Sequence, residues 1–201
     1  MPTLKEQLIK TYESGKSVLE VAQTLNYSPA KVRYWMNKYS IKMRGHSEAA
    51  YLKQNPNGDP FNIKVDLSPN EKILYGLGIG IYWGEGNKMN KRALRVTNSD
   101  PKMIKIFAKF LRVILGVRND KIKYSLICFN DSDPGTVRLH WSHMLNISPE
   151  KFGKITQIPT QGKGTYKKKS EFGVCIIYVG NIKLREWMKQ QIQLIEDYNF
   201  V

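Results

Sequence analysis

A row of glycines inside a helical segment is the feature that most constrains how this chain can fold. Gly76, Gly80 and Gly84 recur at a strict spacing of four residues, with Gly78 between them. Each interior glycine costs a helix about 1 kcal/mol relative to alanine. Because four residues make nearly one turn, the three glycines form a bare stripe against which a second backbone can pack closely. The stripe therefore predicts an interface between two helices, with Gly76, Gly80 and Gly84 at its centre.

The ends of this segment are marked as clearly as its interior. Ser68 is placed to cap a helix, Pro69 fits the first helical position, and Glu71 completes a capping box. The helix is expected to end at the Gly84-Glu85-Gly86 tripeptide. A carboxylate would then lie beside the point where two such helices meet, which in a strongly basic protein suggests a metal ion held over a phosphodiester.

A membrane helix is the first alternative explanation of the stripe. The uncharged run from Ile73 to Gly84 is 12 residues long and is bounded by Lys72 and Glu85, whereas a membrane span needs about 18 to 20 apolar residues. The chain also does not open with a basic stretch followed by an apolar one, as a signal peptide would. We expect no membrane partner, and a purely structural core helix stays open as the second alternative.

Composition favours an anionic partner. The chain has 201 residues and a formal net charge of +15, a balance most often found in proteins that bind nucleic acid. Its two cysteines, Cys128 and Cys175, are embedded in apolar runs and lack the spacing of metal ligands. They are expected to be buried free thiols in a reducing, cytoplasmic environment.

The first 46 residues predict a small domain of three helices. An amphipathic first helix stops before Gly15, Ser17 and Glu20 form the capping box of a second, and Ser28 caps a third. A short turn separates the last two helices, an arrangement typical of a helix-turn-helix. Residues 15–36 resemble the helix-turn-helix of resolvase-like and regulator proteins.

In such a motif the third helix enters the major groove of DNA by its N-terminal half. Residues 1–44 carry eight Lys or Arg against three Glu, which supports that partner. A trihelical protein-interaction domain with a solvated basic face is the alternative. The predicted DNA-facing residues are Ser28, Ala30, Lys31, Arg33 and Tyr34, and the predicted phosphate contacts are Lys38, Lys42 and Arg44.

We predict a linker over residues 47–66, because adjacent turn-forming residues and two prolines disfavour helix and strand at the centre of this segment. Part of it, residues 47–54, is compatible with a short helix. The core domain is then expected to span residues 67–201.

The core alternates strand and helix patterns after the glycine-rich segment. The expected strands cover 93–98, 121–129 and 172–179, with a weaker one at 154–158, and the expected helices cover 101–115, 134–145 and a last segment capped by Asn181. This order predicts an α+β domain in which helices back one antiparallel sheet.

The end of the glycine-rich segment resembles a known family. The nine residues Gly78-Ile-Gly-Ile-Tyr-Trp-Gly-Glu-Gly86 are similar to the motif of the LAGLIDADG homing endonucleases. Gly80 and Gly84 fall on its two small packing positions, and Glu85 falls on its acidic position. Gly78 stands where the family usually has leucine.

The resemblance covers roughly residues 67–201, and Trp83 replaces the first, variable acid of the motif. The family half-unit runs helix, two strands, helix, two strands, helix. Here the helix predicted at 134–145 falls between strands and no hairpin directly follows the motif, so the sheet topology stays open.

The resemblance implies a function. Single-motif members of the family form homodimers, which would place two copies of Glu85 near one axis and present two basic sheets to a near-palindromic duplex. Glu85, helped by the Gly84 carbonyl, would bind Mg²⁺, and the activity implied is cleavage of double-stranded DNA. The alternative is a non-cleaving transcription regulator that keeps the same fold and binds DNA.

The lysine-rich segment 160–170 has no acidic residue and suits a path along phosphates, although a solvated hairpin tip is the plainer reading. Its predicted DNA contacts are Lys163, Lys167, Lys168 and Lys169, and the candidates for a second catalytic group are Gln161, Lys163 and Lys167. His140 and His143 lie about one turn apart, but the chain offers no further zinc ligands at a suitable spacing, so we predict an ordinary helical pair.

Overall fold

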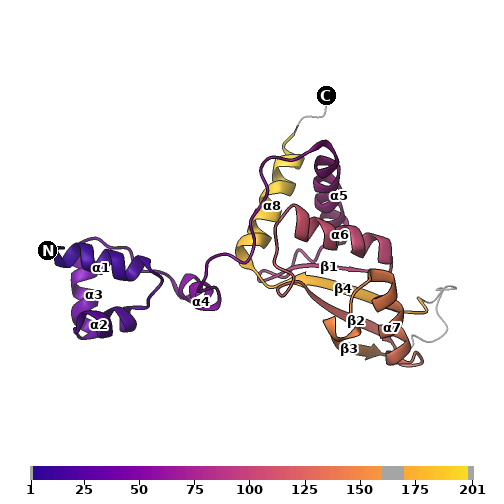
Figure 1. The fold of residues 1–201 in the computed structure, drawn as a ribbon, viewed down its shortest axis with the longest axis horizontal. Helices are drawn as coiled ribbons and strands as arrows, with labels where there is room; N and C mark the ends of the chain where they lie inside the picture. The colour runs from indigo at the N-terminus through magenta and orange to yellow at the C-terminus, as the bar shows by residue number, and fades with distance from the viewer. Residues whose placement is uncertain (1, 160–169, 199–201) are drawn as a thin grey trace. The chain divides into compact units, whose positions relative to one another are not determined.

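The computed structural model describes residues 2–159 and 170–198, and the chain divides into two compact units, 1–60 and 61–201 (Figure 1). The boundary at residue 60 divides the segment 47–66 between the two units. Each unit has a hydrophobic cluster of its own.

Unit 1–60 is helical. Its elements are α1 (Leu4–Glu13), α2 (Val18–Leu25), α3 (Pro29–Lys38) and α4 (His46–Gln54). The capping box predicted at Ser17 is present, since the Ser17 amide donates to the Glu20 carboxylate over 2.7 Å. Asn26 takes a left-handed conformation (φ 55°) that turns the chain from α2 into α3. The first three helices bury one cluster of side chains, composed of Leu8, Tyr12, Val21, Ala22, Val32 and Met36.

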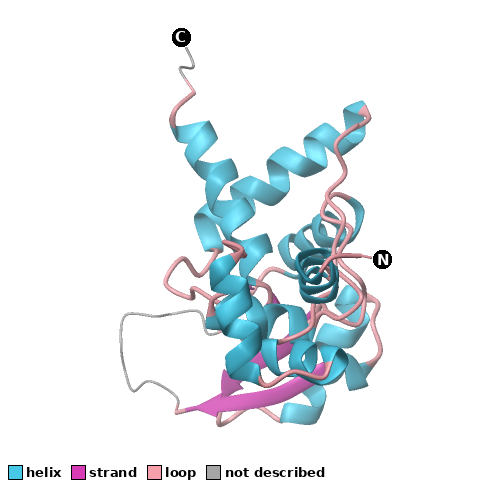
Figure 2. Cartoon of the chain, turned by 90° about the vertical axis from the view of Figure 1, so that its left-hand side faces the viewer, coloured by secondary structure: helices cyan, strands magenta, loops and turns pink. Residues whose placement is uncertain are grey.

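Unit 61–201 is an α+β domain. Its helices are α5 (Pro69–Glu85), α6 (Pro101–Val113), α7 (Pro134–Leu145) and α8 (Ile182–Glu196), with a single turn η1 (Pro149–Lys151) before the third strand. Its strands are β1 (Leu94–Asn98), β2 (Lys123–Phe129), β3 (Phe152–Ile158) and β4 (Val174–Val179). In Figures 1 and 2 the long helices α5 and α8 stand away from the sheet on the same side.

The sheet is mixed, so the expectation of one antiparallel sheet is wrong. The strand order is β1-β4-β2-β3, in which β4 pairs antiparallel with β1 and β2, whereas β2 and β3 pair in parallel. The reason is the connection between β2 and β3, which contains α7. A helical crossover returns the chain to the starting edge of the sheet, and this permits parallel pairing.

The two faces of the sheet differ in character. Alternate residues such as Leu94, Val96, Leu126 and Ile177 join one hydrophobic cluster, to which all four helices of the unit also contribute. Because successive side chains point to opposite faces of a strand, the residues between them form the other face. The helices therefore lie in one layer over the inward face. The outward face carries mostly polar and half-buried side chains, with the buried Ile176 among them.

Helix α5 begins as the sequence predicts. The Glu71 carboxylate accepts hydrogen bonds from the Ser68 amide and hydroxyl, each 2.9 Å long, and pairs with Lys64 at 2.7 Å. The Lys64 ammonium and these two donors together lower the pKa of Glu71 to about 2. The start of the helix is thus fixed by its cap and a local ion pair.

Close packing between α5 and α6 depends on Gly78. A Cβ atom placed on Gly78 would lie 2.2 Å from the Phe110 ring, and Phe110 is fully buried. By contrast, Cβ atoms placed on Gly76, Gly80 and Gly84 would meet nothing within 4 Å in this chain. Of these four glycines, Gly78 is therefore the one that α5 needs for close packing within its own unit.

Both cysteines are buried, as expected, and burial raises the pKa of each thiol. None of the helices in the described ranges combines the length and the apolar composition required to cross a bilayer.

Two alanine variants of α5 test this packing. We expect Gly78→Ala to lower the free energy of unfolding by about 1 to 3 kcal/mol, because the added methyl overlaps a buried ring. The matched control, Gly76→Ala, should leave stability unchanged or raise it by up to about 1 kcal/mol through higher helix propensity. Urea unfolding followed by circular dichroism measures both, and equal stability of the two variants would contradict the proposed role of Gly78.

Candidate nucleic-acid interface

The glycine stripe of α5 faces away from its own unit. Gly76, Gly80 and Gly84 are exposed. Large apolar side chains flank them, with Ile73 63% exposed, Leu77 48% and Trp83 44%. Most soluble helices bury their apolar side chains against the core, whereas α5 leaves these three partly in solvent. We call this outward surface of α5 (Ile73, Gly76, Leu77, Gly80, Trp83 and Gly84) the α5 stripe.

Glu85 lies at the end of the α5 stripe, as the last residue of the helix. Its side chain is exposed and, within the described residues, makes no hydrogen bond or ion pair. The last turn of α5 carries no basic residue, so the carboxylate adds its charge to the negative end of the helix dipole. The Gly84 carbonyl beside it likewise has no hydrogen-bond donor in the described ranges. Oxygen atoms of this kind are the ligands that hard cations prefer.

The end of α5 is tied to the edge of the sheet. Gly86 pairs with Val96 in an antiparallel bridge, and the Asn87 amide donates to the Arg95 carbonyl over 2.9 Å. The Gly86 amide closes the helix on the Tyr82 carbonyl at 2.8 Å, and a Cβ on Gly86 would lie 2.3 Å from that oxygen. The chain therefore leaves α5 directly into contact with β1, which places Glu85 beside the sheet edge.

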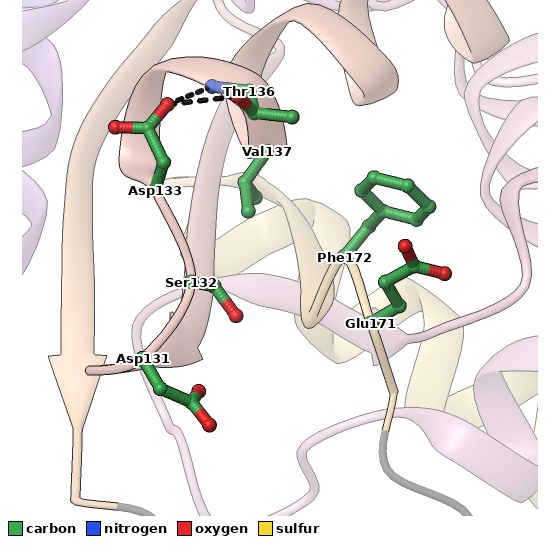
Figure 3. Close-up of a pocket in the computed structure, with 7 residues that line it drawn as sticks. All are labelled: Asp131, Ser132, Asp133, Thr136, Val137, Glu171 and Phe172. Carbon is green, nitrogen blue, oxygen red and sulfur yellow. Dashed lines mark hydrogen bonds between the residues drawn. The ribbon is translucent and has the colours of Figure 1, made fainter.

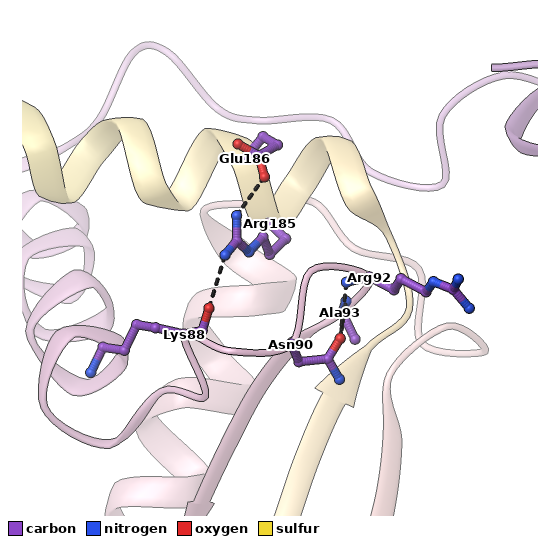
Figure 4. A network of polar contacts seen from close by, with 6 residues as sticks. All are labelled: Lys88, Asn90, Arg92, Ala93, Arg185 and Glu186. Atoms are coloured by element: carbon purple, nitrogen blue, oxygen red, sulfur yellow. Dashed lines mark hydrogen bonds and ion pairs between the residues drawn. The ribbon is translucent and has the colours of Figure 1, made fainter. Parts of the chain in front are cut away.

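Arg185 of α8 holds the segment that joins α5 to β1 (Figure 4). Its guanidinium donates to the Lys88 carbonyl over 3.0 Å and pairs with Glu186 at 2.5 Å. Within the segment, the Asn90 side chain accepts from the amides of Arg92 and Ala93. These contacts fix the path of the chain just after Glu85.

The outward face of the sheet begins with a basic row beside this segment. Arg95 of β1 and Lys123 of β2 are both partnered with Tyr178 of β4, so the three side chains cross the sheet on one face. The next row consists of Thr97, Ile176 and Ser125. The alternation of side chains along each strand, visible in the sequence, could have indicated which residues face outward. Without the strand order, however, the sequence could not show which of them are neighbours across the sheet. We call these six residues the open sheet face.

In the other unit, the predicted DNA-facing residues of α3 lie on the surface. Ser28, Ala30, Lys31, Arg33, Tyr34 and Lys38 are all exposed, as is Lys42 in the following segment. The Lys31 ammonium lies 4.3 Å from the centre of the Tyr27 ring, and the Lys38 ammonium lies 4.8 Å from that of Trp35. The surface of α3 thus combines cations with aromatic rings, a mixture that suits nucleic acid.

Arg44 has a different position from the one that a phosphate contact needs. Its guanidinium lies 3.9 Å from the centre of the Tyr12 ring and donates to the backbone carbonyls of Tyr12 and Lys16. Its amide also donates to the Tyr12 hydroxyl over 2.8 Å. Arg44 therefore ties the segment after α3 to the end of α1.

The remaining predicted groups fall into two sets. Gln161, Lys163, Lys167, Lys168 and Lys169 lie outside the described residues. His140 stacks on Phe172 with ring centroids 3.7 Å apart, and burial lowers its pKa.

A hollow of about 460 Å³ opens near the end of β2 (Figure 3). Three carboxylates line it, from Asp131, Asp133 and Glu171, together with Phe172. The Asp133 carboxylate caps α7 by accepting from the Thr136 amide and hydroxyl, which lowers the pKa of Asp133. Such a concentration of negative charge in the described lining repels phosphate, so we do not include this hollow in the candidate interface.

No cluster of three or more His, Cys, Asp or Glu side chains suited to a metal ion occurs in residues 2–159 and 170–198. One chain thus offers Glu85 and the Gly84 carbonyl as oxygen ligands, and a second copy would double that set. Comparisons with models of protein families, with curated proteins and with solved structures found no match to this chain.

Proposed function

We propose that this chain is a sequence-specific DNA-binding protein that acts as a homodimer and cleaves duplex DNA with Mg²⁺, in the manner of the LAGLIDADG homing endonucleases that its motif resembles. The observation that carries the proposal is the placement of Glu85. An exposed, unpaired carboxylate ends the α5 stripe and lies beside the basic row of the open sheet face.

The first step of the argument is the dimer. Three exposed glycines leave room for a second backbone. Ile73, Leu77 and Trp83 expose apolar surface that a partner would cover. A second copy of α5 fits this surface, because the same stripe is complementary to itself across a two-fold axis. Two Glu85 carboxylates would then lie near that axis.

The second step is DNA. A two-fold dimer would present two copies of the open sheet face, each with Arg95 and Lys123 available for phosphates and Tyr178 between them. Polar side chains on such a face suit the edges of bases in the major groove, which admits a β-ribbon. The α3 surface of the first unit would add contacts of its own. The net charge of +15 favours this partner throughout.

The third step is the metal. Glu85 and the Gly84 carbonyl are hard oxygen ligands without competing partners in the described chain, so their chemistry fits Mg²⁺. A bound divalent ion would supply an activated water and stabilise the charge on the leaving oxygen. Each protomer brings one Glu85 carboxylate. Packing of α5 against α5 of the second protomer would hold the two carboxylates close together.

A non-cleaving transcription regulator with the same DNA-binding surfaces is the second candidate. It is favoured by the single carboxylate that each chain brings to the end of α5, and by the α3 surface, which can recognise DNA without chemistry. Incubation of the protein with a randomised plasmid library and Mg²⁺ separates the two. Breaks at defined sequences support the nuclease, and specific binding without breaks supports the regulator.

Glu85→Gln is expected to abolish cleavage while leaving DNA affinity unchanged or higher. The substitution keeps the shape of the side chain but removes a charge that binds metal and repels phosphate. Glu196→Gln is the matched control, because Glu196 is also an exposed last residue of a helix. Plasmid cleavage and filter binding measure both properties, and a Glu85→Gln enzyme that still cuts would remove Glu85 from the mechanism.

Gly80→Leu is expected to convert the dimer into monomers. A Leu side chain on the α5 stripe would hold the facing backbone away and weaken the interface by roughly 1 to 3 kcal/mol or more, while the same position has open space within its own chain. Gly80→Ala is the milder control. Light scattering measures the mass, and an unchanged dimer in the Leu variant would show that dimerisation uses another surface.

The paired variant Lys31→Gln with Arg33→Gln tests α3. Removing two cations from the DNA-facing surface of α3 should make the salt dependence of log K shallower by up to about 1.8, because each neutralised phosphate contributes about 0.9. The control pair, Lys5→Gln with Lys10→Gln, removes the same charge from exposed positions of α1. Fluorescence anisotropy at several salt concentrations gives the slopes, and identical slopes for the two pairs would exclude α3 as a DNA-reading helix.

A further inference from the structure

The outer face of α6 is a continuous basic stripe. Its members follow one another at helical spacings of three, four and three residues and are all exposed: Lys102, Lys105, Lys109 and Arg112. The opposite face of α6 is fully committed to the core through Ile104, Phe107 and Leu111. The basic stripe therefore points away from the sheet, on the helical side of the unit, and is separate from the open sheet face.

The charges of this stripe are not neutralised by their surroundings. Within the described residues, none of the four side chains forms an ion pair, and Arg112 has a hydrogen-bond partner in the Tyr124 hydroxyl. Neighbouring like charges destabilise a helix, and Lys102 lies in the first turn, where the helix dipole disfavours a cation. The repulsion between these cations lowers the stability of the isolated protein. An anionic partner extended along the helix would relieve it.

The stripe runs into a hollow of about 260 Å³ at the C-terminal end of α6. Arg112 and Lys151 approach this hollow from different elements, and Asn119, Ser148 and Tyr124 also line it. Among the described residues, its lining contains no carboxylate. A guanidinium, an ammonium, an amide and hydroxyls are the donors that bind a phosphate group. Burial raises the pKa of Tyr124, with Arg112 opposing that effect, so the Tyr124 hydroxyl stays protonated and able to donate.

We propose that α6 and the Arg112–Lys151 hollow form a second binding surface for a phosphodiester backbone, on the side of the unit opposite the open sheet face. This inference rests on the proposed function, in which the open sheet face binds DNA. The α6 surface would bind a second segment of nucleic acid. The hollow takes one phosphate, and the lysines of α6 contact those that follow it along the strand.

The extent of the surface favours a polymer over a free phosphate. Ten residues separate Lys102 from Arg112, which on a helix corresponds to about 15 Å. An isolated phosphate would occupy the hollow alone and leave the three lysines without a partner. A nucleic-acid strand carries one charge per about 3.4 Å of its axis, so it can satisfy the hollow and the stripe together.

The test compares three paired variants of the full chain, each of which removes two charges. Lys105→Gln with Lys109→Gln changes the α6 stripe, Arg95→Gln with Lys123→Gln changes the open sheet face, and Lys72→Gln with Lys189→Gln is the control at exposed positions elsewhere. A labelled DNA duplex of mixed sequence is titrated into each protein at several salt concentrations. Circular dichroism confirms that each variant is folded.

At low salt we expect the wild-type dimer to bind one duplex across its two open sheet faces and additional duplex on the two α6 stripes. The α6 pair should keep only the duplex on the sheet faces, and its overall salt dependence of log K should be shallower by about 1.8. The control pair should behave as wild type. An α6 pair with wild-type stoichiometry and slope overturns the inference, and it leaves the proposed function standing if the sheet pair loses DNA binding. If only the α6 pair loses duplex binding, the result supports the inference and counts against DNA binding by the open sheet face.

A second arm identifies which nucleic acid occupies the surface. Single-stranded RNA is titrated into protein already saturated with duplex, using wild type, the α6 pair and the single variant Lys151→Gln. RNA that binds wild type and is lost in both variants assigns the surface to RNA, whereas competition by excess duplex assigns it to DNA. Equal RNA binding by all three proteins, together with unchanged duplex binding by the α6 pair, overturns the inference.

Discussion

The contact between α5 and α6 at Gly78 is the constraint on which the rest of the core depends. Because Gly78 has no side chain, α5 can approach the buried Phe110 ring closely, and this contact fixes the rotation of α5 about its own axis. The other glycines are then turned outward, and the end of the helix meets β1 through Gly86 and Asn87. The position of Glu85 follows from these contacts and needs no interaction of the carboxylate itself.

Charge is distributed unevenly around this core. The open sheet face and the outer face of α6 lie on opposite sides of the unit, and each carries cations without acidic partners in the described chain. Three carboxylates gather instead around the hollow near the end of β2. A nucleic acid approaching such a molecule is attracted to the basic sides and repelled from the acidic one, so electrostatics would orient the encounter before any base is read.

Local features were predictable from the sequence, because they depend on residues close together in the chain. The caps at Ser17 and Ser68 are examples, since a Glu three residues further on completes each capping box. The end of α5 is another, since it falls within the Gly84-Glu85-Gly86 tripeptide. The parallel pairing of β3 was not predicted, because register depends on where a crossover returns the chain. The position of Arg44 was also missed, since its partner, Tyr12, lies 32 residues earlier. The lysines of α6 were visible, but only the orientation of that helix shows that they share an exposed face.

The strand order also determines when this sheet can be completed as the chain is made. The strand between β1 and β2 is β4, the last of the four to be synthesised. Until β4 is inserted, β1 has no neighbouring strand except its bridge to Gly86, and its pairing with β4 spans a long stretch of sequence. Long-range pairings of this kind form slowly, whereas the short helices of residues 1–60 make mostly local contacts. The N-terminal unit can therefore fold on the ribosome while the first strands of the core still wait for their partner.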